Sequence, residues 1–212
     1  MQLYTYFRSS ASYRVRIALH LKGLAFDTVP VHLLRDGGEQ HGEAYRAINP
    51  AQLVPALVDE GLSLGQSVAI MEYLEEAYPS PALLPTDRAT RAQVRAVVQA
   101  IACDIHPLNN LRVLQYLEHT LGQDEATRAT WYRHWITLGF EALEAQLAQT
   151  AGAFCFGDAP TLADCCLIPQ VANSRRFQTP LERFPAIVRI DAHCRSLPAF
   201  IAAAPDNQPD FA

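Results

Sequence analysis

YTYFRSSASYRVRIAL, residues 4–19, is the stretch that decides the fold at the start of this chain. A short aromatic run, which favours a strand, ends at Arg8, and three serines follow within four positions. An apolar repeat at helical spacing then begins at Val15. The pattern predicts a strand over Gln2–Tyr6 that turns at once into a helix over Ser12–Leu21.

The start of that helix is a candidate anion site. A helix N-terminus carries unpaired backbone N–H groups and a partial positive charge. The hydroxyls of Ser9 and Ser10 can cap the helix or donate to a bound thiolate, phosphate or carboxylate, and Arg8, Arg14 and Arg16 add positive charge. A serine that acts only as the N-cap explains the same residues, so this stretch alone leaves both interpretations open.

Composition and charge narrow the function classes. The net charge of −5 argues against a nucleic-acid partner, and no apolar run approaches the length of about 20 residues that crosses a membrane. The five cysteines are odd in number and irregularly spaced, which favours reduced thiols in a cytoplasm over a disulfide framework. Cys165 and Cys166 follow Asp164, but no second ligand cluster is near, so we expect no metal site.

The signals divide the chain into two domains. Residues 1–80 predict a small α/β domain, with strands at 2–6, 27–33, 54–58 and 62–64 and helices at 12–21, 43–48 and 67–77. Residues 78–87, YPSPALLPTD, carry three prolines and are typical of a linker. Residues 88–212 predict an all-helical domain, with helices over 89–121 and 124–150, one that starts at Thr161, and one or two further helices within 181–205. Pro107 should break the first, and the polar chain end is expected to fray.

A second stretch, residues 49–74, NPAQLVPALVDEGLSLGQSVAIMEYL, adds two further binding features. A cis bond between Val54 and Pro55 would turn the Val54 backbone outward, where its N–H and C=O could pair with an extended peptide. Gln66 and Ser67 open the next helix and make a second anion site. Two helix N-termini and one open backbone edge suit a small, anionic, peptide-like ligand.

With these motifs in place, the chain resembles the zeta class of glutathione transferases, the family of maleylacetoacetate and maleylpyruvate isomerases. The resemblance covers nearly the whole chain in order. It is carried by SSASYRVRIAL (9–19), NPAQLVPAL (49–57), GQSVAIMEYLEEAYP (65–79), CDIHPLNNLRVL (103–114) and PTLADCCLIPQVANSRRF (160–177).

The resemblance implies a thioredoxin-like N-terminal domain, an all-α C-terminal domain, a homodimer and glutathione as cofactor. It also implies cis–trans isomerisation of a maleyl dicarboxylate. The expected reaction converts maleylacetoacetate to fumarylacetoacetate in the catabolism of tyrosine and phenylalanine. Three alternatives stay open: a maleylpyruvate isomerase, a general glutathione transferase with an apolar second pocket, and a non-catalytic binding protein. A thiol–disulfide oxidoreductase is disfavoured because the chain has no CxxC.

The family's functional residues map onto this sequence one by one. Ser9 and Ser10 would face the glutathione sulfur, beside Ala11, and Arg8 and Arg176 would hold the substrate carboxylates. The remaining cofactor contacts would come from Gln40, Val54, Pro55, Gln66, Ser67, His106, Asn110, Leu111 and Arg112. Arg175 is the alternative to Arg176 for binding a substrate carboxylate. Adjacent residues on a helix point in different directions, so only one of the two is expected to face the site.

One position departs from the family. Many zeta-class members have SSCS where this chain has residues 9–12 as SSAS, so Ala11 replaces a cysteine. We expect that cysteine to be auxiliary, because the reacting thiol belongs to glutathione.

Overall fold

A four-stranded sheet organises the first part of the chain. The strands β1 (Gln2–Thr5), β2 (Asp27–Pro30), β3 (Ala56–Asp59) and β4 (Leu62–Gly65) lie in the order β2-β1-β3-β4. Strand β1 pairs parallel with β2 and antiparallel with β3, which is antiparallel to β4. The helices between them are α1 (Ser10–Leu21), α2 (Glu43–Ile48) and α3 (Ser67–Ala77). The predicted β-α-β-α-β-β-α order is confirmed.

Helix α1 begins two residues before the predicted start because Ser9 is its N-cap. The β3–β4 hairpin turns between the two predicted strands, at Glu60 and Gly61, which both have positive φ, 46° and 86°. Two consecutive positive φ values suit a two-residue hairpin loop, whose twist matches that of the strands.

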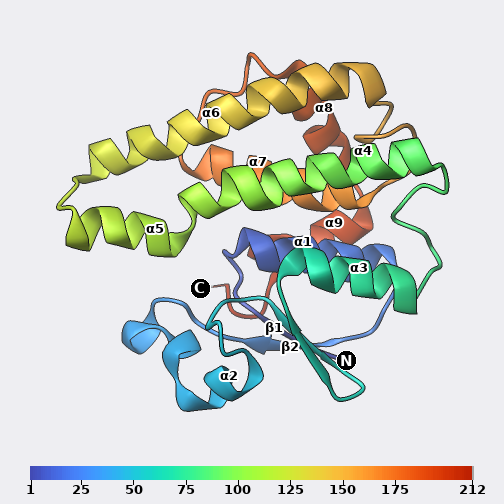
Figure 1. The fold of residues 1–212 in the computed structure, drawn as a ribbon. Helices are drawn as coiled ribbons and strands as arrows, with labels where there is room; N and C mark the ends of the chain where they lie inside the picture. Colours follow the sequence, from blue (N-terminus) through green and yellow to red (C-terminus); the bar gives the residue numbers. More distant parts are fainter. Residues whose placement is uncertain (212) are drawn as a thin grey trace. The chain divides into compact units, whose positions relative to one another are not determined.

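The helices cover both faces of the sheet, α1 and α3 on one face and α2 on the other (Figure 1). Leu3 and Leu57 are paired in register and fully buried. The next pair, Tyr4 and Ala56, points to the opposite face because side chains alternate along a strand. There Ala56 belongs to a cluster with Val31 and Tyr45 of α2. The fold is the expected α/β arrangement.

The structure, a computed structural model, describes residues 1–211, and they form two compact units. The first unit joins Met1–Leu84 to the segment that begins at Arg195, and the second is Pro85–Cys194. The sequence predicts one helical domain over residues 88–212. The division differs for the segment that begins at Arg195, which belongs to the first unit. A helical pattern shows that a segment has an apolar face, but it does not show which body that face covers.

Within the first unit, a buried arginine joins the C-terminal segment to the N-terminal part of the chain. Helix α9 (Pro198–Ala203) contacts α1, and the guanidinium of Arg16 donates to the carbonyl of Ala203 at 2.9 Å. It also donates to the Thr5 hydroxyl at 2.9 Å and to the Phe7 carbonyl at 3.1 Å. Burial lowers the pKa of Arg16 to about 10, so the hydrogen bonds offset a cost of burying the charge.

The last residues make specific contacts up to Phe211, so the expectation of a frayed end is wrong for this segment. A carboxylate oxygen of Asp210 accepts the backbone N–H of Phe7 at 2.9 Å. The Phe211 ring meets the Phe7 ring edge to face, with centroids 5.5 Å apart. Composition alone misses these contacts because they join residues about 200 positions apart. They fix the chain just before Arg8.

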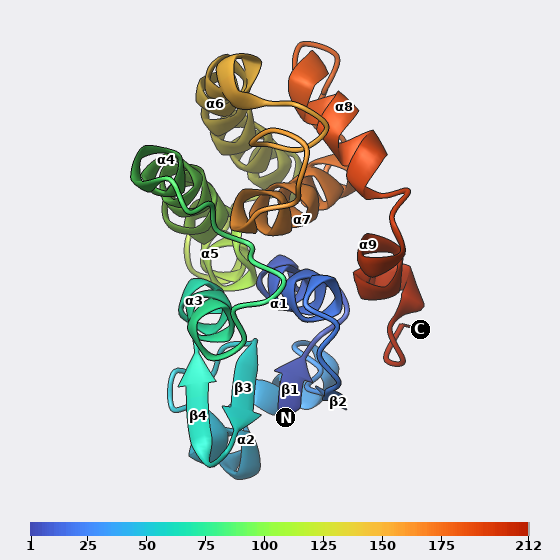
Figure 2. The same cartoon turned by 90° about the vertical axis from the view of Figure 1, so that its right-hand side faces the viewer.

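The second unit consists of helices. They are α4 (Arg88–Gln99), α5 (Leu111–Gln115), α6 (Glu125–Thr150), α7 (Leu162–Arg176) and α8 (Pro185–Cys194). Helix α7 packs against α4 and α8 (Figure 2). Between α4 and α5 the helix runs through a wider turn, Ala100–Ile105, and a tighter one, His106–Asn109. The predicted break at Pro107 is confirmed, and Asn110 then caps α5.

The capping box at the start of α7 forms as the sequence indicates. The Thr161 hydroxyl accepts the Ala163 N–H at 3.2 Å, and Asp164 accepts the Thr161 N–H at 2.8 Å. Asp164 also accepts the backbone N–H of Cys155 at 2.8 Å, so this carboxylate is used inside the fold.

All five cysteines are free thiols, and only Cys103 is exposed. Within residues 1–211, no helix is both long and apolar enough to cross a bilayer.

Candidate functional site

The sheet register brings three of the expected binding features together at one edge of the first unit, the end of the sheet where β1 and β4 finish and β3 begins. Tyr4 of β1 lies opposite Ala56 of β3, which lies opposite Gly65 of β4. Because β3 is antiparallel to both neighbours, the chain enters β3 at the edge where it leaves β1 and β4. The segment after β1, the Val54-Pro55 peptide and the start of α3 therefore meet at that edge.

The start of α1 fits an anion. The Oγ of Ser9 accepts the backbone N–H of Ser12 at 3.2 Å, which occupies a lone pair and leaves the hydroxyl proton available to donate. Ser10 is buried and Ala11 half-buried in the first turn. No acidic residue lies in that turn, so the partial positive charge of the helix end is not neutralised locally.

The start of α3 makes the second such position. Gln66 is the N-cap with a φ of +67°, and its exposed side chain makes no capping hydrogen bond. A positive φ is uncommon for glutamine and often marks a functional backbone position. The adjacent Ser67 is buried, and its Oγ accepts from Nη1 of Arg14 at 3.1 Å. Arg14 of α1 thus fixes the beginning of α3.

The Val54 backbone is open. Its peptide bond to Pro55 is cis, as expected. The neighbouring Leu53 carbonyl accepts from the Tyr45 hydroxyl at 2.6 Å and the Asn49 side-chain amide at 2.7 Å, which holds the loop in place. Among residues 1–211, neither the N–H nor the C=O of Val54 has a hydrogen-bond partner, so both can pair with an extended ligand.

Gln40 lies in the turn Glu39–His41 and is buried. Its Nε2 donates to the Leu33 carbonyl at 3.4 Å, and its Oε1 has no partner among the described residues. The neighbouring His41 ring hydrogen-bonds the Gln52 side chain at 2.7 Å. That contact ties the turn to the segment that leads into Val54.

The site residues expected from the second unit lie around the start of α5. His106 and Leu111 are half-buried and Arg112 is exposed. The side-chain oxygen of Asn110 accepts the Val113 N–H at 3.2 Å, so it has a structural role and only the Asn110 NH₂ group is left to bind a ligand. Arg112 could have a purely structural role if it formed a salt bridge inside the fold. Within residues 1–211 it forms no ion pair.

The two adjacent arginines at the end of α7 differ in their contacts. Nη2 of Arg175 pairs with the buried Asp191 carboxylate at 2.6 Å. Arg176 is exposed, its guanidinium carbon lies 4.9 Å from the centre of the Phe177 ring, and no carboxylate among the described residues pairs with it. Arg176 is therefore available to a ligand carboxylate, while Arg175 is already used.

Arg8 in the first unit has the same character as Arg176. It is exposed, its guanidinium carbon lies 5.0 Å from the centre of the Phe7 ring, and it has no carboxylate partner within residues 1–211. An aromatic ring restrains such a cation without neutralising it, so the charge stays available.

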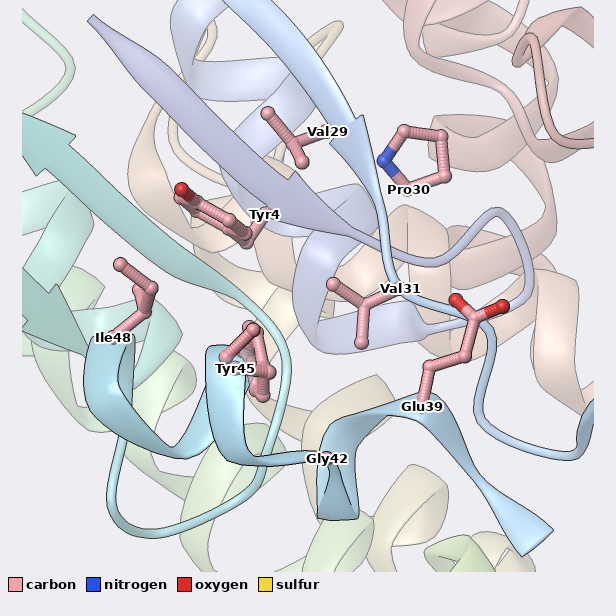
Figure 3. A pocket seen from close by; sticks show the side chains of 9 residues that line it. Tyr4, Val29, Pro30, Val31, Glu39, Gly42, Tyr45 and Ile48 are labelled. Atoms are coloured by element: carbon pink, nitrogen blue, oxygen red, sulfur yellow. The ribbon is translucent and has the colours of Figure 1, made fainter. Parts of the chain in front are cut away.

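A hollow of about 310 Å³ lies on the α2 face of the first unit. Tyr4, Tyr45 and Ile48 line it, and the carboxylate of Glu39 lies at its border (Figure 3). None of its lining residues is a predicted site residue. This hollow is part of the packing between the sheet and α2, and we assign it no role in binding.

Comparison with known proteins identifies the family. The family models "Glutathione S-transferase, N-terminal domain" and "Glutathione S-transferase, C-terminal domain" match residues 3–82 and 138–195. A probable maleylacetoacetate isomerase of Vibrio cholerae is 52% identical over 98% of this chain and 97% of its own length. A holo structure of a maleylpyruvate isomerase, described as a bacterial glutathione S-transferase in zeta class, is 51% identical and superposes with a TM-score of 0.97 over 100% of both chains. This chain belongs to the zeta class of glutathione transferases.

A further solved relative bears on the ligand. A maleylacetoacetate isomerase from Anaeromyxobacter dehalogenans 2CP-1 has bound GSH in its active site. It is 44% identical, with a TM-score of 0.89 over 100% of this chain and 97% of its own. This zeta-class chain therefore shares its fold with a protein that holds glutathione.

Two supporting residues were not identified as such from the sequence. Arg14 and Arg16 were expected to add charge at the start of α1, yet both are buried and bind other elements, Ser67 and the chain end. A signal was present: they alternate with Val15 and Ile17 in a helix that is buried on nearly every side. A cation at a buried position must find its partners inside the fold.

Proposed function

We propose that this zeta-class protein is a glutathione-dependent cis–trans isomerase that converts maleylacetoacetate to fumarylacetoacetate in the catabolism of tyrosine and phenylalanine. The observation that carries the proposal is the edge of the first unit, where two acid-free helix starts meet an open Val54 backbone. Relatives that are 52% and 51% identical to this chain are named as isomerases of maleyl compounds, which supports the proposed reaction.

The residues present fit glutathione. The Val54 N–H and C=O would pair with the cysteinyl backbone, beside Pro55. Gln66 and Ser67 would hold the γ-glutamyl end. The unpartnered Oε1 of the buried Gln40 supports its assignment to the glycyl end. We assign the remaining cofactor contacts to Ser9, Ser10, Ala11, His106, Asn110, Leu111 and Arg112.

When bound, glutathione supplies a thiol nucleophile that can add reversibly to a maleyl double bond. Such a thiol has a pKa of about 8.5 in water and is mostly protonated at neutral pH. The N-terminus of α1 and the free O–H of Ser9 favour the thiolate, because both place positive charge near an anionic sulfur. Ser10 completes this hydroxyl pair.

The substrate is a dianion near neutral pH, so it needs a cation for each carboxylate. We assign one carboxylate to Arg8 and the other to Arg176, both exposed and without an acidic partner among residues 1–211. A guanidinium binds a carboxylate through two parallel hydrogen bonds, which fixes orientation as well as charge.

The role of Gln40 can be tested from a neighbouring glycine. A Cβ placed on Gly38 would collide with the side-chain amide of Gln40, whereas one on Gly37 meets nothing within 4 Å. Both glycines have positive φ, so Gly37→Ala is the matched control for backbone strain. Gly38→Ala should displace the amide and raise KM for glutathione about 2–10-fold, the scale of one net hydrogen bond. Equal glutathione kinetics in the two variants would remove Gln40 from the site.

Steady-state rates with three substrates test the proposed reaction. We expect kcat/KM for maleylacetoacetate to exceed that for conjugation of a neutral electrophile, which the two arginines do not help. Maleylpyruvate is the second candidate, since a relative of that name is 52% identical over 100% of both chains. A higher kcat/KM for maleylpyruvate would select the second reaction, and a higher value for the neutral electrophile would favour a general transferase.

Assembly and location complete the proposal. The family supports a homodimer, which the molar mass in solution would test. The five free thiols support a cytoplasmic setting, where thiols stay reduced.

A further inference from the structure

His41 lies between two segments that we assign to neighbouring parts of glutathione. It follows Gln40 directly in the turn Glu39–His41, and its exposed ring contacts two side-chain amides. The ring nitrogen Nε2 lies 3.0 Å from Nε2 of Gln40, and the ring nitrogen Nδ1 lies 2.7 Å from Oε1 of Gln52. Gln52 comes two residues before Val54. One imidazole therefore joins the turn that carries Gln40 to the loop that leads into the open Val54 backbone.

A single tautomer of neutral His41 satisfies both contacts. A neutral imidazole has one N–H donor and one acceptor nitrogen. The Oε1 of Gln52 can only accept, so Nδ1 of His41 carries the proton and donates to it. Nε2 of His41 then has a free lone pair, which accepts from the NH₂ group of Gln40. The three side chains form a directed chain of hydrogen bonds, from Gln40 through His41 to Gln52.

The contact with His41 is the shorter of two that hold the Gln40 amide. Nε2 of Gln40 also donates to the Leu33 carbonyl, but at 3.4 Å, outside the usual range of about 2.7–3.2 Å for such bonds. Because both protons of this NH₂ group are used inside the fold, Oε1 is the polar atom of Gln40 that is left for a ligand. It has no partner within residues 1–211. The glycyl residue of glutathione offers a matching donor, its peptide N–H.

We propose that His41 is a positioning residue that fixes the side-chain amide of Gln40 for the glycyl end of glutathione. The proposal rests on the proposed function, in which Gln40 contacts that end and the Val54 backbone pairs with the cysteinyl residue. His41 touches neither the cofactor nor the substrate in this account. By joining Gln40 to Gln52, it sets the spacing between contacts to two adjacent residues of the ligand. An amide that is already ordered loses less side-chain freedom on binding.

The dissociation constants of two thiol ligands, measured by calorimetry on the full-length protein, test this role. The ligands are glutathione and γ-glutamylcysteine, which lacks the glycyl residue. His41→Phe keeps a ring but removes both nitrogens, so we expect Kd for glutathione to rise about 2–10-fold, the scale of one net hydrogen bond. Kd for γ-glutamylcysteine and the melting temperature should not change.

A second background and a control complete the experiment. In a Gln40→Ala background, His41→Phe should have no further effect on Kd for glutathione, because the amide that it positions is gone. His119→Phe, at an exposed histidine of the second unit, should match wild type with both ligands.

The outcomes separate failure of the proposal from failure of the function. Wild-type protein that binds no glutathione would contradict the proposed function itself. If Gln40→Ala leaves Kd for glutathione unchanged, Gln40 is not part of the site and His41 has no amide to position. If Gln40→Ala weakens glutathione binding but His41→Phe does not, the positioning role is overturned. An equal effect of His41→Phe on both ligands, or the same factor in both backgrounds, would show a structural role and also overturn it.

Discussion

Replacing Arg176 with alanine should raise KM for the maleyl dicarboxylate by about 10–150-fold and leave KM for glutathione nearly unchanged. Hydrogen bonds to charged groups contribute about 1.5–3 kcal/mol, and the substrate carboxylate would lose both its bidentate partner and its countercharge. Steady-state kinetics with each ligand varied in turn measure the two effects separately. Arg8→Ala should show the same selectivity, because it is assigned to the other carboxylate.

The chain offers a matched control for this prediction. Arg175 is next to Arg176 but is paired with the buried Asp191, so Arg175→Ala should lower the melting temperature and leave KM unchanged. Arg176→Lys should recover only part of the loss, since an ammonium lacks the planar fork. Unchanged isomerase kinetics in both Arg8→Ala and Arg176→Ala would remove the two-arginine account and the main reason to prefer an isomerase over a general transferase.

Replacing Ser9 with alanine should lower kcat about 10–100-fold and change KM for glutathione much less. The Ser9 hydroxyl proton is free while its oxygen caps α1, so its expected contribution is to stabilise a thiolate, on the charge-assisted scale of hydrogen bonds. Rapid kinetics of the bound thiol as a function of pH would show its pKa moving up in the variant.

Because Ser9 is also the N-cap, the variant needs a control that keeps the helix start. Ser9→Asp retains a good capping residue but removes the donor and adds a negative charge, so it should fold as well as wild type and lose at least as much activity as Ser9→Ala. Retained activity in Ser9→Asp would show that capping alone is the role of Ser9. A loss in Ser10→Ala that is absent from Ser9→Ala would reverse the assignment of the two serines.

Local patterns predicted the elements of this fold well. The bounds of α2 and α3 are those expected, and the Thr161–Asp164 cap forms as its residues indicate. These features depend on neighbours within one helical turn, where side-chain and backbone preferences act directly. The Val54-Pro55 cis bond was also expected, because a cis bond is one way to place a proline just before a strand and the family resemblance implies it.

The features that the sequence did not predict are contacts between residues far apart in the chain. Asp210 meets Phe7, and Arg16 meets Ala203, across almost the whole chain. No periodicity encodes such partners. For the same reason the local pattern alone could not separate Arg175 from Arg176, because the difference lies in Asp191, on another helix. Local sequence defined the candidate residues of the site, whereas tertiary contacts decide which of them remain available to a ligand.

The most direct test of the account is the balance of glutathione during turnover. Purified protein is incubated with a large molar excess of maleylacetoacetate over glutathione, and fumarylacetoacetate and free glutathione are both followed to completion. The account predicts no turnover without glutathione, and with it many product molecules per glutathione, all of which is recovered as the free thiol. Loss of one glutathione for each substrate consumed, or full activity without it, would contradict the account.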